Sequence, residues 1–381
     1  MAASKLGAAP KPGRDRRLDF FRGLGLLFIF VNHIPDNAFS FLTLSNFLFC
    51  DAAEIFVFLS GYAAAVVFGA RAQRDGNLYA MTTILARVWT LYVAHIFLFV
   101  IYTAQVAWTA QSFDNPLFIE EMQIAAFLDR PHVAILQALL LAHQPLFMNI
   151  LPLYIALLLG FAFALPAIPR VGPAMLVASA LLYACVPLFG WNLPAYPEGA
   201  WFFNPFAWQF LFVLGIACGW RAGVAGDPVA TPGWMFRAAL VFLIVTIPIR
   251  TWVSLGYYFD VVPPAFAEIV FQFADKTNQG PLRLLSLLAL AIVVVRLVPR
   301  GSRWMEARWA RAIERCGVNS LPIFCVGIFL SVGGHALLVE YGSTLVHQAV
   351  VTAAGAFLLL VLAKFFSWYK SRARARAGAG D

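Results

Sequence analysis

Four ionisable side chains stand in apolar surroundings near the start of the chain, where a lipid-facing helix should carry none. Arg22 and His33 fall in the first apolar segment, and Asp51 and Glu54 open the second. Ionisable groups inside membrane segments are energetically costly and mark functional sites by default. A histidine with a carboxylate partner is the arrangement of a general base, because the carboxylate fixes the imidazole tautomer and stabilises the imidazolium. These residue types therefore indicate proton transfer.

The spacing of these residues predicts how they are placed. Arg22 and His33 are eleven positions apart, which at about 100° per residue puts them on nearly one helix face with a rise of about 16 Å. Asp19, three residues before Arg22, can form an ion pair with it. We expect His33 and Glu54 to meet in the outer half of the membrane. Two alternatives stay open: His33 caps a helix end or bonds a neighbouring helix, and Arg22 extends to the cytoplasmic interface.

The composition is that of a membrane protein. Of the 381 residues, 61% are hydrophobic and 12% are charged, whereas a soluble domain is about half apolar and about a quarter charged. We therefore predict an all-α fold, a polytopic helix bundle in a lipid bilayer. In such a protein the net charge of +8 reports orientation rather than nucleic-acid binding. The five cysteines are scattered singly without a CxxC pair, so no metal site is expected.

Ten apolar segments predict ten transmembrane helices, because a helix needs about 20 residues to cross a bilayer. One membrane domain, residues 18–367, is expected to lie between two basic tails, a disordered one at 1–17 and a second at 368–381. Loops 109–146 and 256–280 are long, and residues 132–143 predict a short interfacial or re-entrant helix. The ten segments are 18–36, 47–69, 80–108, 147–166, 172–190, 202–220, 235–255, 281–298, 318–338 and 345–367.

The distribution of basic residues predicts the orientation. Ten spans put both termini on the same side of the membrane. Of the 27 lysines and arginines, all but Arg130, Arg250, Lys276 and Arg283 fall on the side of the termini. Because basic residues accumulate on the cytoplasmic side, both termini are expected in the cytoplasm.

The charged segments resemble a known superfamily. LDFFRGLGLLFIFVNH, residues 18–33, resembles the opening of the acyltransferase-3 superfamily of membrane acyltransferases, and EIFVFLSGY, residues 54–62, is similar to its acidic-aromatic run. More narrowly, the chain resembles the osmoregulated periplasmic glucan succinyltransferases of the OpgC type. That likeness spreads over residues 51–62, 149–155, 201–215, 275–285 and 320–331.

The resemblance implies an activity and roles for individual residues. It implies a multi-pass protein of the bacterial inner membrane that moves a succinyl group from cytoplasmic succinyl-CoA, a co-substrate, to a hydroxyl of a periplasmic glucan, without a bound cofactor. By position, His33 is the catalytic base, Glu54 its acidic partner and Arg22 a ligand of the acyl-CoA donor. Of the superfamily's Arg-x-x-Arg at the start of the third span, only Arg87 is present, because Thr90 stands at the second position.

Three further polar residues are predicted to bind substrate. Asn204 is a candidate donor to the oxyanion of the transition state. Arg283 is a candidate partner for the succinyl carboxylate, with an ion pair to Asp275 or Glu54 as its alternative. Asp51, one helical turn above Glu54, completes this set.

Two other functions stay open. One is an acetyltransferase that modifies another surface polysaccharide, and the other is a glycan exporter without enzymatic activity. The identity of the acyl donor distinguishes an acetyltransferase from a succinyltransferase. Survival of function in a His33→Ala variant would indicate an exporter. Neither the acceptor hydroxyl nor the oligomeric state follows from the sequence.

Overall fold

The chain folds as a bundle of helices. A computed structural model describes residues 15–227, 229–259 and 261–377, so most of the expected tail at 1–17 lies outside the described residues. Within the described part no β-strand occurs, and only isolated bridges link His143 with Tyr196 and Pro194 with Ala200. The predicted all-α fold is confirmed.

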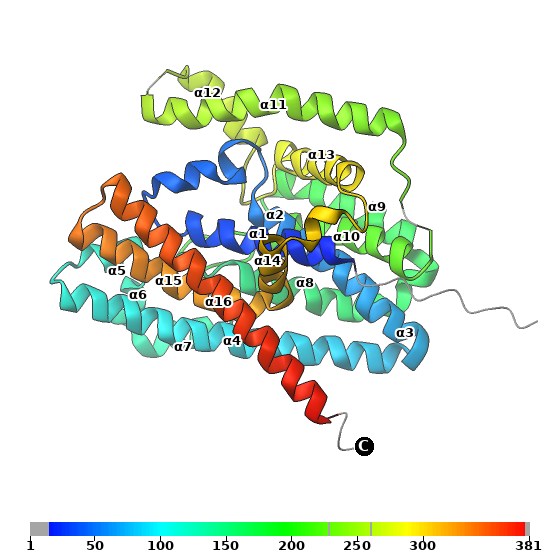
Figure 1. The fold of residues 1–381 in the computed structure, drawn as a ribbon, viewed down its shortest axis with the longest axis horizontal. Coiled ribbons are helices and arrows are strands. Elements are labelled where there is room, and N and C mark those ends of the chain that lie inside the picture. Colours follow the sequence, from blue (N-terminus) through cyan, green and yellow to red (C-terminus); the bar gives the residue numbers. More distant parts are fainter. Residues whose placement is uncertain (1–14, 228, 260, 378–381) are drawn as a thin grey trace, which may run out of the picture.

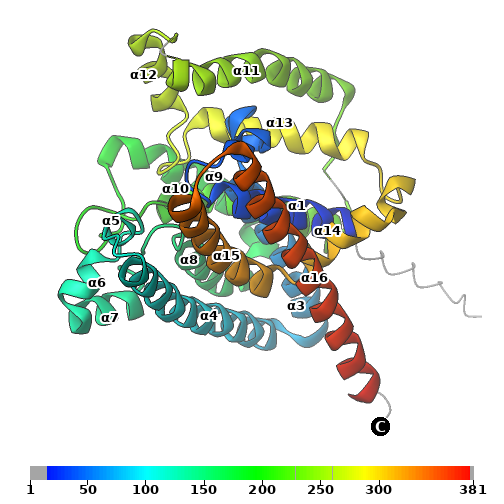
Figure 2. The same ribbon diagram turned by 60° about the vertical axis from the view of Figure 1, so that its left-hand side comes forward.

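The two helices that carry the predicted site lie in the middle of the bundle (Figures 1 and 2). Helix α1 spans Arg16–Asn32, and α2 spans Ala52–Ala64 and continues through one π-helical turn into α3, Ala70–Asp75. Helix α1 packs against α2, α14 (Arg308–Val318) and α15 (Ser320–Tyr341), and α2 packs against α10 (Pro205–Gly223). Surrounding helices thus remove the polar groups of α1 and α2 from lipid.

The remaining long helices enclose this centre. Helix α8 packs between α4 and α10, whereas α11 and α13 lie together above α1 in both views (Figures 1 and 2). Helix α16 runs beside α15 and α14 and continues to Ala377, through most of the segment expected to be a tail. Their bounds are Asn77–Ser112 for α4, Ile150–Ala164 for α8, Ile168–Phe189 for α9, Gly233–Phe259 for α11, Pro281–Leu297 for α13 and Leu345–Ala377 for α16.

The long loops contain short helices. The segment predicted as a loop at 109–146 begins with the last turn of α4 and then forms three short helices. The last of these, α7, covers the expected short helix only as far as Leu139, and Leu139 accepts a hydrogen bond from Tyr92 of α4. The second loop begins within α11, whose helix runs on to Phe259. The short helices are α5 (Leu117–Glu121), α6 (Ala125–Asp129), α7 (Pro131–Leu139) and α12 (Pro264–Phe273).

Seven helical stretches within the described residues are long and apolar enough to cross a membrane. One of them, Ile150–Phe189, covers two of the predicted spans, at 147–166 and 172–190. Helices α1 and α13, which cover two more predicted spans, have 17 residues each. The structure therefore bears out a multi-pass membrane protein, and the number of ten spans stays a prediction.

Basic residues gather at the end of the bundle where α1 begins. Arg16 forms an ion pair of 2.6 Å with Glu314 of α14, and Arg17 donates to the carbonyl of Val298 at 2.7 Å. Lys370, near the end of α16, donates to Asn319 Oδ1 at 2.8 Å. The first turn of α1 and the last turns of α16 therefore lie at one end of the bundle, and the expectation that both termini are on the same side of a membrane stays a prediction. Which side of a membrane this end faces stays a prediction.

Glycines bring α1 and α14 into backbone contact. A Cβ atom on Gly317 would lie 1.8 Å from the carbonyl oxygen of Asp19, and one on Gly23 would lie 2.0 Å from that of Ile313. Close approach of this kind needs residues without a side chain. This crossing fixes α14 against the turn of α1 that carries Arg22.

Replacing Gly317 with alanine is expected to destabilise the protein by about 1–3 kcal/mol, because overpacking forces backbone shifts. Thermal unfolding of the purified protein in detergent would measure the change. Gly327→Ala is the matched control, since a Cβ there would meet no atom within 4 Å. Equal stability of the two variants would contradict the close crossing of α1 and α14.

Candidate active site

The start of α2 carries two acidic residues that cap their own helix. Asp51 Oδ1 accepts a hydrogen bond of 2.8 Å from the Ala53 amide, and Glu54 Oε2 accepts one of 2.8 Å from the Asp51 amide. This reciprocal arrangement is a capping box, in which side chains satisfy amides that the helix leaves unpaired. The Asp-Ala-Ala-Glu spacing at 51–54 follows the same four-residue pattern. The box fixes the positions of both carboxylates.

Two cations from another part of the chain neutralise these carboxylates. Arg283, in the first turn of α13, donates from Nε to Glu54 Oε1 at 2.6 Å, and its Nη2 lies 3.2 Å from Asp51 Oδ2. Lys276 Nζ donates to the same Asp51 oxygen at 2.6 Å. The side chain of Glu54 is fully buried, and a buried charge is stable only when it is paired. The predicted alternative for Arg283, a pair with Glu54, is the one that the structure contains.

Asn204 holds the loop that carries Lys276. Its side-chain oxygen accepts from the Phe206 amide at 3.0 Å and caps α10. Its amide nitrogen donates to the Trp191 carbonyl at 2.6 Å and to Asn278 Oδ1 at 2.8 Å. Both hydrogens of the Asn204 side-chain amide are thus bonded within the protein. The prediction that Asn204 donates to the oxyanion does not agree with this arrangement. The structure makes Asn204 a positioning residue.

His33 ends α1 and faces this charged cluster. Its ring stacks on Phe147 with centroids 4.2 Å apart, and Asp51 and Lys276 act on it electrostatically. The Nδ1 atom is buried and has no hydrogen-bond partner among the described residues. The expected contact with Glu54 is not a hydrogen bond among the described residues; Glu54 accepts instead from Arg283 and from the Asp51 amide.

The loop between α1 and α2 links the end of α1, next to His33, to Arg250 of α11. Asn32 Oδ1 lies 2.8 Å from the Thr43 hydroxyl, which lies 2.9 Å from the Ser45 hydroxyl. The carbonyl of Ser45 accepts from Nε of Arg250 in α11 at 2.9 Å. In the sequence, Arg250 is distinguished only as one of the four cations expected away from the side of the termini, and that unusual position is the available signal.

Arg22 lies farther along α1, toward the basic end of the bundle. Its Nη1 is 3.9 Å from Asp19 Oδ1, which is the predicted pair, and its Nη2 donates to the Leu59 carbonyl at 3.2 Å. The structure therefore separates Arg22 from His33 along one helix, as the eleven-residue interval predicts.

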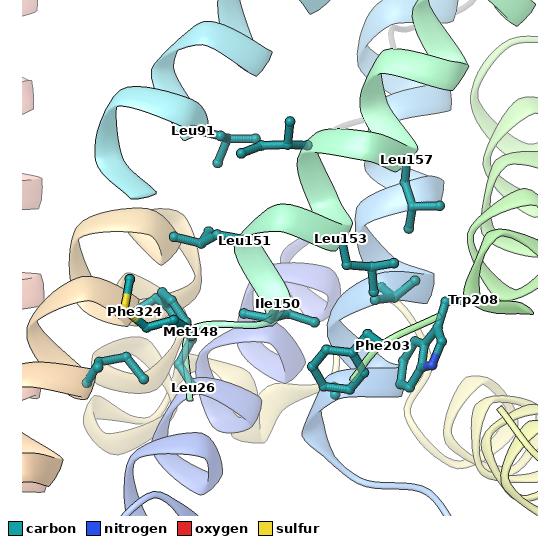
Figure 3. Close-up of a cluster of buried hydrophobic side chains, with 14 of the residues drawn as sticks. Leu26, Leu91, Met148, Ile150, Leu151, Leu153, Leu157, Phe203, Trp208 and Phe324 are labelled. Carbon is teal, nitrogen blue, oxygen red and sulfur yellow. The ribbon is translucent and has the colours of Figure 1, made fainter. Parts of the chain in front are cut away.

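Arg87 lines an apolar pocket between these two positions. Among the described residues it forms no hydrogen bond or ion pair, and it shares the pocket with Ile29, which lies one helical turn before His33. Part of the apolar wall belongs to the buried cluster of Figure 3, where helices distant in the sequence meet; the shared residues are Leu91, Ile150, Leu151 and Phe324. The other lining residues are Phe56, Leu91, Ile150, Leu151, Tyr154, Ser320, Leu321 and Phe324.

The chain has a clear relationship to one protein family. The family model described as "OpgC protein" matches residues 14–371, nearly the whole chain. No curated protein and no solved structure matches the sequence. The match includes every residue of the cluster described above.

Proposed function

The chain belongs to the OpgC protein family, and we propose that it transfers a succinyl group from succinyl-CoA to a hydroxyl group of a periplasmic glucan. Membership of this family indicates a bacterial membrane acyltransferase that acts on osmoregulated periplasmic glucans. The succinyl group, the CoA donor and the roles of individual residues are parts of the proposal. The more distant likeness to the acyltransferase-3 superfamily stays a prediction.

The observation that carries the mechanism is the environment of His33. A buried ring nitrogen without a partner costs free energy unless a bound group completes its hydrogen bonding. We assign that place to the hydroxyl of the glucan. His33 accepts the hydroxyl proton while the oxygen attacks the thioester carbonyl, and the imidazolium returns the proton to the departing CoA thiolate. The products are the glucan ester and CoA.

The charged cluster supports this step electrostatically. Burial and the Lys276 ammonium disfavour the imidazolium of His33, and the Asp51 carboxylate offsets part of that effect. The Lys276 ammonium is paired with Asp51, and because its side chain is 36% exposed we assign it a second contact with the developing oxyanion. Glu54 and Arg283 act through position, since their buried pair holds the start of α2 against α13. A preorganised site of this kind needs no rearrangement of charges during the reaction.

The donor is assigned to the side of Arg22 and Arg87. A guanidinium group suits the geometry of the phosphates of CoA, and Arg87 has no partner among the described residues that competes for it. The apolar pocket beside Ile29 lies between Arg22 and His33 along α1. We place the pantetheine arm along this wall, with the thioester toward His33, and the pocket must widen to admit it because its volume of about 10 Å³ is room for about one water molecule.

Donor preference tests the proposal. Purified protein in lipid nanodiscs would receive a β-glucan with succinyl-CoA or with acetyl-CoA, and mass spectrometry would follow free CoA and the acylated glucan. We expect CoA release that depends on the glucan and favours succinyl-CoA. Equal or exclusive use of acetyl-CoA would remove the succinyl assignment. Glucan transport without any CoA release would instead support an exporter.

A further inference from the structure

Arg250 is a cation beside the site that lacks an anionic partner. It lies in α11 and is partly buried, and its Nε donates to the Ser45 carbonyl at 2.9 Å. Among the described residues no carboxylate pairs with it, and neither Nη atom donates to a protein group. Its guanidinium fork therefore has two nitrogen atoms free for a ligand.

The charges around Arg250 do not balance. Lys276 and Arg283 are both paired with the carboxylates of Asp51 and Glu54, and Arg283 and Asp51 are the charged groups that act on Arg250. Three cations therefore face two carboxylates. A partly buried positive charge in excess is stabilised by an anion. The arrangement favours a ligand that brings one negative charge.

Arg250 and His33 share one acidic neighbour. Asp51 acts electrostatically on His33 and on Arg250. The hydrogen-bonded groups of Asn32, Thr43 and Ser45 also lead from the end of α1 to the carbonyl that holds Arg250. These contacts place Arg250 beside the loop that follows His33, where it can receive the anionic group of a ligand bound at His33.

We propose that Arg250 binds the free carboxylate of the transferred acyl group and thereby selects a dicarboxylic acyl donor. This inference rests on the proposed function and gives the specificity role to Arg250 instead of Arg283, whose guanidinium is paired with Glu54 and Asp51. In a succinyl thioester two methylene groups separate the reacting carbonyl from the carboxylate. The carboxylate would accept two parallel hydrogen bonds from the Arg250 fork, the geometry that arginine provides best.

Succinyl-CoA and butyryl-CoA provide a matched pair of donors, because both have four-carbon acyl chains and only the first carries a terminal carboxylate. We expect Arg250→Met to lower kcat/KM for succinyl-CoA by about 100-fold, the effect of one charge-assisted contact. Transfer from butyryl-CoA should change less than about threefold, since that donor makes no such contact. Arg237→Met is the control, because Arg237 is an exposed arginine of the same helix.

The outcomes separate the inference from the proposed function. A wild-type protein that uses neither donor, or that prefers butyryl-CoA, would overturn both. A wild-type preference for succinyl-CoA that survives in Arg250→Met, or an equal loss with both donors, would overturn the role of Arg250 alone. If size-exclusion chromatography shows that Arg250→Met does not fold like the wild type, Arg250→Lys replaces it in the experiment. The lysine keeps the positive charge but cannot form two parallel hydrogen bonds, so kcat/KM should fall about tenfold with succinyl-CoA and stay unchanged with butyryl-CoA.

Discussion

Replacing His33 with alanine is expected to abolish acyl transfer while the protein still folds and inserts. General-base catalysis contributes about 100- to 10,000-fold to a rate, and the described residues offer no second histidine beside Asp51 and Lys276. Stability should change little, because two effects oppose each other. The variant loses the stacking on Phe147, and it also removes a buried Nδ1 that has no hydrogen bond. The measurements are the rate of glucan-dependent CoA release and the melting temperature of the same preparation.

A second histidine serves as the control for this experiment. His347, at the start of α16, is exposed and lies 3.0 Å from the Thr344 hydroxyl, so His347→Ala should leave both readouts unchanged. Near-normal turnover in His33→Ala would remove the central claim of the mechanism. A fall in rate together with a large fall in melting temperature would show a structural role for His33.

Replacing Arg283 with methionine is expected to destabilise the protein by about 3–5 kcal/mol, because it leaves a buried carboxylate without its partner. Glu54 is fully buried and receives its shortest hydrogen bond, 2.6 Å, from Arg283. The capping box alone cannot neutralise that charge, since it supplies only the Asp51 amide. Denaturation of the purified variant in detergent, followed by circular dichroism, would measure the loss.

Two variants show whether the buried charge causes this effect. Lys276→Met should cost less than Arg283→Met, because the side chain of Lys276 is partly exposed and Asp51 keeps its contact with Arg283. The double variant Glu54→Gln with Arg283→Met removes both charges and should recover part of the stability, which is the signature of direct coupling. Additive losses in the double variant would argue against a coupled pair.

Helix positions were the most predictable part of the structure. Each of the ten apolar segments falls on helix, because an apolar run of about 20 residues can satisfy its backbone hydrogen bonds in lipid only by forming one. The ends were less predictable. Helix α1 ends at Asn32, before the expected end at 36, since Pro35 follows and His33 already has non-helical angles. The tail after 367 is largely helical because its alanines and arginines favour a helix.

Interactions between distant residues could not be predicted from spacing. His335 has no acidic residue at helical spacing, and it pairs with Glu121 of α5 at 2.8 Å. Arg283 and Glu54 are 229 positions apart in the chain, and Arg250 and Ser45 are 205 apart. Helical periodicity places side chains on faces of their own helix only. It does not say which other helix meets that face.

The sequence by itself therefore determined a multi-pass helical protein and pointed to the residues at α1 and α2 for which we propose the chemistry. Hydrophobicity and helical period act locally, so both can be read along the chain. Only the tertiary structure decided the ionic partners of those residues. Because α13 packs against α2, Arg283 forms an ion pair with Glu54. Because α11 lies beside the loop between α1 and α2, Arg250 donates to the Ser45 carbonyl. Ion pairing depends on which side chains come within a few ångströms, and the packing of the whole bundle sets that distance.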